Sequence, residues 1–192
     1  IYQQIEPFKN RPAGKLSGGM KQKLALSCAL IHKPKVLFLD EPTTGVDAVS
    51  RKEFWDMLNR IRNQGISIMV STPYMDEARL CDRVGLIQQG SLLSIDTPGS
   101  IISRYPHRLM AVKSENTYRL IRDLKNYDQT HSVYPFGEYL HYAPREKSSG
   151  PDQLKSYLKD NGHQNAEVKE IKAGIEDCFM ELMSSRHKKE TA

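Results

Sequence analysis

Two short stretches decide the fold of this chain: LSGGMKQ at residues 16–22 and VLFLDEP at residues 36–42. The glycines of the first stretch are followed by apolar residues at helical spacing, which predicts a helix over residues 20–32 that ends before Pro34. The second stretch is a continuous apolar run that ends in two acids, which is typical of a central strand buried on both faces of a parallel sheet. A helix that starts at glycines and a strand that ends at carboxylates are therefore the first elements of the predicted fold.

The sequence on the carboxyl side of these stretches continues to alternate helix and strand signals. It predicts, in chain order, a helix over residues 48–64, a strand over 66–71, a short helix over 75–81 and a hairpin over 84–95. Residues 1–100 are thus expected to form an α/β domain with a parallel sheet.

A second organisation follows, after a border predicted near residues 97–106, where TPG and YP interrupt the pattern. Beyond it the sequence predicts strands over residues 109–113, 131–134, 139–143 and 166–171, and helices over 116–127, 152–161 and 175–184. This βαββαβ order with one added helix is typical of a small ferredoxin-like α+β sandwich. Residues 101–192 are therefore predicted to be a C-terminal α+β accessory domain.

Composition excludes several classes of protein. The net charge of +5 is spread over both halves, with 13 basic and 10 acidic residues in residues 1–100, so we expect no nucleic-acid partner. The longest uncharged stretch, residues 63–75, is too short and too polar for a membrane span. Three widely spaced cysteines indicate a reducing cytoplasm rather than a disulfide framework. Because the chain opens with Ile1 and not Met, we expect a piece of something longer.

The two deciding stretches also carry the groups best suited to chemistry. Backbone N–H groups at a helix that opens with Gly18 and Gly19 can bind a phosphate, and Ser17 can add a hydroxyl donor. Asp40 and Glu41 at a strand end can hold Mg²⁺ and activate water. The simpler alternatives are a glycine turn with a serine N-cap, and a solvated strand end.

Together the two stretches resemble the signature and Walker B motifs of the ATP-binding cassette (ABC) family. The resemblance implies the fold of the C-terminal part of a P-loop NTPase cassette. It implies that the first motif binds ATP held on a partner cassette through Ser17, Gly18, Gly19 and Gln22. In the second motif it assigns Mg²⁺, held through water, to Asp40 and the role of general base to Glu41.

Two further segments match the family, and one position departs from it. Residues 43–48 are similar to the D-loop, in which Asp47 would couple two nucleotide sites; Asp47 is also placed to cap the helix that follows, and both can be true. The family carries a switch histidine after the strand over 66–71, whereas Pro73 stands at that position here. Proline has no side-chain donor and no titratable group, so it cannot replace the histidine's contact with the γ-phosphate.

A P-loop of the form G-x-x-x-x-G-K-S/T does not occur in the sequence, since Gly14-Lys15 is followed by Leu16. We therefore expect the chain to be the back portion of a cassette that, alone, neither binds ATP tightly nor hydrolyses it. The small domain that ends in GIEDCFMEL at residues 174–182 looks like the one appended to many bacterial exporter-type ABC ATPases.

These features lead to one functional hypothesis and two alternatives. The first is an ATP-binding segment of an ABC exporter, cytoplasmic and peripheral at the membrane, with a second cassette and a transmembrane subunit as partners. The second is a degenerate, non-catalytic cassette that supports an active partner, which Pro73 favours and Glu41 opposes. A soluble ABC ATPase that acts on ribosomes or DNA is disfavoured, because neither half of the chain is strongly basic.

Overall fold

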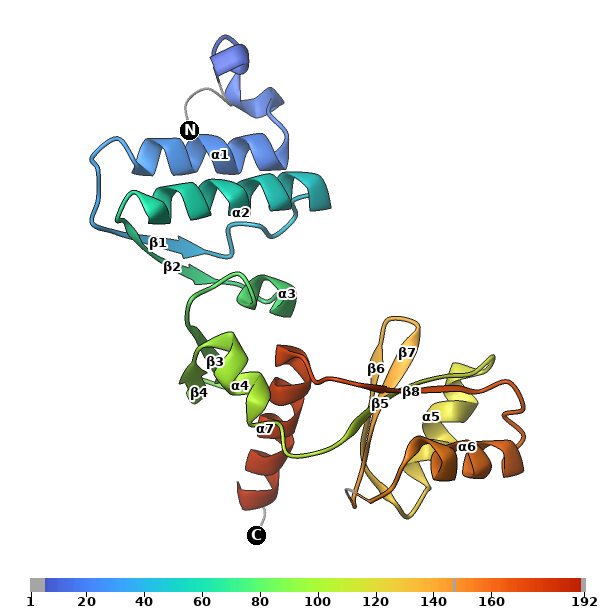
Figure 1. Ribbon diagram of the computed structural model, residues 1–192. Helices are drawn as coiled ribbons and strands as arrows, with labels where there is room; N and C mark the ends of the chain where they lie inside the picture. Colours follow the sequence, from blue (N-terminus) through green and yellow to red (C-terminus); the bar gives the residue numbers. More distant parts are fainter. Residues whose placement is uncertain (1–5, 147, 191–192) are drawn as a thin grey trace. The chain divides into compact units, whose positions relative to one another are not determined.

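The computed structural model describes residues 6–146 and 148–190 and divides into two compact units, Ile1–Asp82 and Arg83–Ala192 (Figure 1). The first unit is α/β with a parallel strand pair, and the second contains antiparallel sheets with helices. Both parts of the predicted fold class are confirmed.

The first unit places two helices against one face of a parallel strand pair (Figure 1). Strand β1 (Val36–Asp40) pairs in parallel with β2 (Ser67–Ser71), and the register sets Asp40 opposite Ser71 at the carboxyl ends. Leu26, Leu37 and a row of apolar residues on the second helix form the core. The elements, in chain order, are two 3₁₀ turns, Glu6–Phe8 and Ala13–Lys15, then α1 (Gly18–Ala29), β1, α2 (Ala48–Asn63), β2 and α3 (Met75–Ala78).

The prediction that β1 is buried on both faces is wrong for the described residues. Leu37 is buried beneath the helices, but Phe38 on the opposite face is 72% exposed. Met69, its partner on β2, is also exposed. Alternation along a strand sends neighbouring side chains to opposite faces, and α1 and α2 cover only one of them. The apolar run correctly predicts the strand, but it does not predict which faces of the strand are covered by other elements.

The second unit begins with the predicted hairpin, which is followed by a helix that the sequence pattern did not indicate. Strands β3 (Val84–Gln88) and β4 (Ser91–Asp96) turn at Gln89 and Gly90, both of which have positive φ, as a tight hairpin requires. Residues 97–99, interpreted above as a break, instead start α4 (Pro98–Ser103): the Thr97 hydroxyl accepts from the N–H of Ser100, and Pro98 occupies the first turn. Proline is favoured there because its missing N–H has no helical partner to lose.

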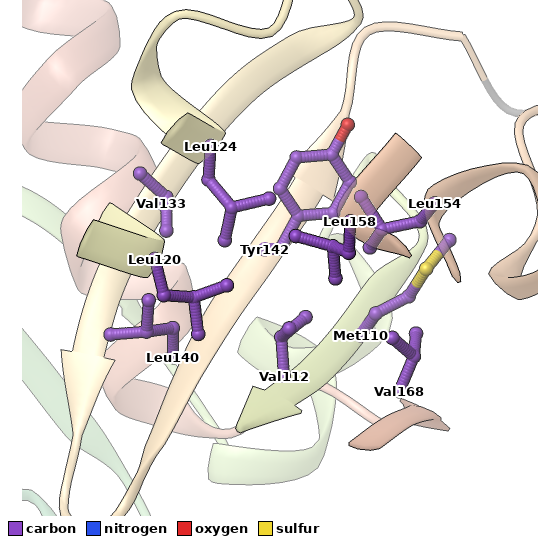
Figure 2. Close-up of a cluster of buried hydrophobic side chains, with 10 residues drawn as sticks. All are labelled: Met110, Val112, Leu120, Leu124, Val133, Leu140, Tyr142, Leu154, Leu158 and Val168. Carbon is purple, nitrogen blue, oxygen red and sulfur yellow. The ribbon is translucent and has the colours of Figure 1, made fainter. Parts of the chain in front are cut away.

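The remaining strands form one antiparallel sheet with the order β6-β7-β5-β8, which is the ferredoxin-like arrangement predicted from the βαββαβ order. Ten buried side chains, drawn in Figure 2, fill the space between this sheet and two helices, and Tyr142 is the largest of them. The elements are β5 (Leu109–Lys113), α5 (Thr117–Lys125), β6 (Thr130–Phe136), β7 (Tyr139–Pro144), α6 (Pro151–Asp160), β8 (Glu167–Ile171) and α7 (Ile175–Glu190).

The compact units divide earlier in the chain than the border predicted near residues 97–106. Helix α4 packs on α7, where the Cys178 thiol lies 3.6 Å from the carbonyl oxygen of Ile101, and the hairpin β3–β4 packs with α4. The hairpin and α4 therefore belong with the later residues. That residues 101–192 act as an accessory domain stays a prediction. Among the helices of the described residues, none combines the length and apolar character needed to cross a membrane.

Candidate functional site

The N-terminus of α1 is built by a serine cap and two glycines. The Ser17 hydroxyl accepts a hydrogen bond from the N–H of Met20 at 3.3 Å, so the helix begins at Gly18, earlier than predicted. Ser17 and Gly18 are exposed, Gln22 is half-buried, and Gly19 is buried. The arrangement leaves the first turn of a twelve-residue helix, with its free N–H groups, open to an anion.

The two glycines also allow this turn to lie against the segment that follows Glu41. A Cβ on Gly19 would fall 2.6 Å from the Cβ of Ser50, and one on Gly18 would fall 3.4 Å from the carbonyl oxygen of Gly45. Only glycine fits at position 19 without displacing Ser50. The predicted signature and D-loop segments are therefore packed together within one unit.

We expect Gly19→Ala to destabilise the first unit. The added methyl must displace the side chain of Ser50, and overpacking of this kind costs about 1–3 kcal/mol, more than the gain of up to about 1 kcal/mol from replacing glycine in a helix. Denaturant unfolding of the whole chain measures the change. Gly14→Ala is the matched control, because a Cβ there meets nothing within 4 Å. Equal stability of the two variants would contradict the close packing at Gly19.

Asp40 and Glu41 lie where the sequence predicts them, at the carboxyl end of β1. The hydroxyl of Ser71, at the end of β2, donates to the Asp40 carboxylate and accepts from the Glu41 N–H at 3.0 Å. The same N–H also reaches the Ser71 carbonyl oxygen at 3.1 Å. One serine thus binds the Asp40 carboxylate and the Glu41 backbone at the shared end of the two strands, and both acidic residues are exposed.

Glu41 has an unusual backbone conformation. Its φ of 43° lies in the left-handed region, which residues with a side chain rarely adopt. The carboxylate accepts a hydrogen bond from the Thr44 hydroxyl at 3.1 Å, and the Glu41 carbonyl oxygen accepts from the Thr44 N–H at 3.2 Å. The turn after β1 therefore holds the Glu41 side chain against Thr44.

These residues fit the groups that the family resemblance implies. Mg²⁺ prefers hard oxygen ligands and keeps several waters, so one exposed carboxylate with a hydroxyl neighbour suits it. The open first turn of α1 suits a phosphate of ATP. Asp40 would hold the cation through water, and Ser17, Gly18 and Gly19 would contact the phosphate.

Asp47 caps α2, as the sequence predicts. Its carboxylate accepts from the N–H of Ser50 at 2.9 Å, and the exposed side chain lies at the start of the helix. Hydrogen bonds from the Ser50 N–H and then from the Ser50 hydroxyl hold the pKa of Asp47 below its ordinary value. The residue is thus a carboxylate at neutral pH, and this local role leaves its predicted coupling role open to experiment.

Pro73 is exposed two residues after the end of β2, and the chain around it is held by a buried acid that sequence reasoning missed. Glu77 is 1% exposed, accepts a hydrogen bond from the Thr72 hydroxyl at 2.6 Å and lies 3.7 Å from the Arg51 guanidinium. That guanidinium also stacks on Tyr74, at 4.0 Å from the ring centre. Residues 72–77 are therefore tied to α2 by a buried ion pair and a cation–π contact.

Comparison with known proteins agrees with these features. The ABC transporter family model matches residues 2–44. The probable multidrug ABC transporter ATP-binding protein YbhF of Escherichia coli is 35% identical over 184 residues, which are 95% of this chain and 31% of YbhF. The Nod factor export ATP-binding protein I of a Rhizobium species is 31% identical over 183 residues, 94% of this chain and 58% of that protein. The solved structure of CbiO1 from Clostridium perfringens, part of the ABC transporter complex CbiONQ, aligns with a TM-score of 0.45 at 31% identity, over 49% of this chain and 38% of that one.

The chain thus spans about a third of YbhF and just over half of the Nod factor export protein. Both relatives match nearly all of it. A family model and relatives that match nearly the whole of this chain, together with the signature and Walker B residues placed as described, lead to one conclusion. The chain belongs to the ATP-binding cassette transporter family, among its ATP-binding proteins.

Proposed function

We propose that this chain supplies the signature helix and the hydrolytic edge of an ATP-binding subunit that drives export. The observation that carries the proposal is the Ser71 hydroxyl, which fixes Asp40 and Glu41 together at the ends of β1 and β2. The signature turn lies against the loop that follows these acids, so one packed unit positions the residues that we assign to the two nucleotide sites.

Each residue has a definite task in this proposal. Ser17, Gly18, Gly19 and the nearby Gln22 bind the terminal phosphate of ATP held on a partner cassette. Asp40 binds the water shell of Mg²⁺, and Glu41 orients an attacking water and takes its proton. MgATP supplies the phosphoryl group that is transferred to water. Asp47, at the start of α2, couples the two nucleotide sites.

The partners follow from the same reasoning. A signature turn that serves ATP on another chain requires a second cassette, either as a separate copy or fused. The name of the Nod factor export ATP-binding protein I supports an exporter. A transmembrane subunit then carries the substrate, and this chain works at the cytoplasmic face of the membrane.

Replacing Ser17 with Asp tests the role of the signature turn. Asp and Asn both cap helices as well as Ser does, so α1 should form in either variant. Asp adds a negative charge where a phosphate should bind, and like charges 4 Å apart repel by about 4 kcal/mol near a protein surface. We expect Ser17→Asp to lower ATP hydrolysis by the full-length protein with its membrane subunit at least tenfold relative to Ser17→Asn. Equal rates in the two variants would show that no phosphate approaches this turn.

The alternative function, a non-catalytic cassette that supports an active partner, is favoured by one observation. Pro73 lies exposed after β2, at the position where the family carries its switch histidine, and has no group that can bind a γ-phosphate. The Glu41 side chain, which accepts a hydrogen bond from Thr44, favours the catalytic proposal instead.

A further inference from the structure

Three metal-binding side chains from separate elements converge in the second unit, away from the residues considered above. His107 lies between α4 and β5, His131 lies on β6, and Glu181 lies on α7. The Nε2 of His131 is 3.0 Å from one carboxylate oxygen of Glu181, and the Nε2 of His107 is 3.7 Å from the other. One ligand atom from each residue lies within 4.8 Å of the other two.

The spacing of these atoms is close to that of a metal site. Ligands bound to a tetrahedral Zn²⁺ at about 2.0–2.1 Å are about 3.3 Å from one another. The two nitrogen-to-oxygen distances of 3.0 and 3.7 Å lie on either side of that value, so small side-chain rotations would bring the three ligands onto one ion. The imidazole rings lie together with their centres 3.9 Å apart, and each presents its Nε2 to the Glu181 carboxylate.

The surroundings favour an ion with one open position. The side chains of His107, His131 and Glu181 are 18%, 21% and 14% exposed, so they are largely desolvated yet reachable from solvent. The Ser185 hydroxyl donates to Glu181 at 3.1 Å, a supporting hydrogen bond of the kind that orients metal ligands.

Two other histidine–carboxylate pairs in this unit provide a contrast. His141 lies 2.7 Å from Asp177, which is one turn before Glu181 on α7, and His163 lies 3.1 Å from Asp123. Each of these carboxylates meets a single imidazole, whereas Glu181 meets two. Among the described residues, the group at Glu181 is the one that brings three metal-binding side chains together.

We propose that His107, His131 and Glu181 bind a Zn²⁺ ion, with water as the fourth ligand. Two imidazoles and a carboxylate form a donor set that suits zinc, and water completes a tetrahedral shell. The ion joins α7 to β6 and to the segment before β5. It therefore fixes the C-terminal helix against the sheet, independently of any nucleotide bound to the first unit.

Titration calorimetry with ZnCl₂ on the chelator-treated 192-residue chain tests the proposal. We expect one equivalent of Zn²⁺ to bind and to raise the midpoint of thermal unfolding. Loss of a supporting residue around a metal weakens binding about 10–100-fold, so His107→Gln, His131→Gln and Glu181→Gln should each weaken it by about 100-fold or more. His141→Gln is the matched control, since it removes an equivalent strand histidine paired with α7, and it should leave the affinity unchanged.

Co²⁺ provides a second measurement on the unaltered protein. Its absorption spectrum should indicate a four-coordinate site with nitrogen and oxygen ligands and without thiolate charge transfer, because the three cysteines lie outside the proposed site. The Co²⁺ spectrum is recorded on the unaltered protein, so it remains a valid test even if a variant does not fold. Circular dichroism shows whether each variant is folded. Absence of Zn²⁺ binding, a thiolate signal from Co²⁺, or an equal loss of affinity in His141→Gln would each overturn the proposal.

Discussion

Glu41→Gln is expected to lower the rate of ATP hydrolysis about 10²–10⁴-fold, the usual contribution of a general base. Glutamine keeps the size of the side chain and an oxygen that can accept from Thr44, but it cannot take a proton from water. Nucleotide binding should be retained. The measurement is kcat for the full-length protein with its membrane subunit, alongside the affinity for MgATP.

An acidic residue away from the proposed site is the control for this loss. Asp56 is exposed on α2, and Asp56→Asn removes one negative charge, as Glu41→Gln does. We expect Asp56→Asn to hydrolyse ATP at the unaltered rate. If Glu41→Gln did so too, Glu41 would not be the base, and the non-catalytic alternative would be favoured.

Pro73→His is expected to raise ATP turnover at this site about 100-fold. A single preorganised donor to the transition state contributes about 10²–10³-fold in other enzymes, and Pro73 has none. Pro73 is exposed two residues after the end of β2, so an imidazole has space there. Because proline has no backbone N–H, its replacement breaks no backbone hydrogen bond donated by this residue. The rate should be measured with the partner cassette's own site disabled, so that one site is observed.

Pro73→Ala separates the imidazole from the change in backbone freedom. Alanine removes the proline ring without adding a donor, so we expect its rate to stay near that of the unaltered protein. A rise in both variants would point to the backbone of residues 72–77 rather than to the imidazole. No rise in either would contradict a catalytic defect at Pro73.

Elements of the fold could be predicted wherever a local pattern had one physical meaning. The apolar run at residues 36–39 gave β1, and the βαββαβ order gave the four-stranded sheet. The prediction of a break at residues 97–99 is wrong, because Thr-Pro-Gly can either interrupt an element or start a helix. Here Thr97 caps α4. The prediction that Phe38 is buried is wrong, because the segments that cover each face of a sheet are distant in the sequence.

The candidate site divides in the same way. Asp40 and Glu41 could be placed at a strand end from their position after the apolar run, but their link through Ser71 depends on the register between two strands. The group of His107, His131 and Glu181 could not be foreseen, because these residues are far apart in sequence and share no metal-binding spacing. Only the folded second unit brings them together.

The left-handed backbone at Glu41 has a consequence for how this gene can change over generations. A non-glycine residue in that conformation costs about 1–2 kcal/mol, and glycine would remove the cost. In a lineage without selection for ATP hydrolysis, substitution of Glu41 by glycine would therefore be favoured, because glycine would increase the stability of the fold. A glutamate at this position in related sequences would then indicate selection for its carboxylate rather than for the fold.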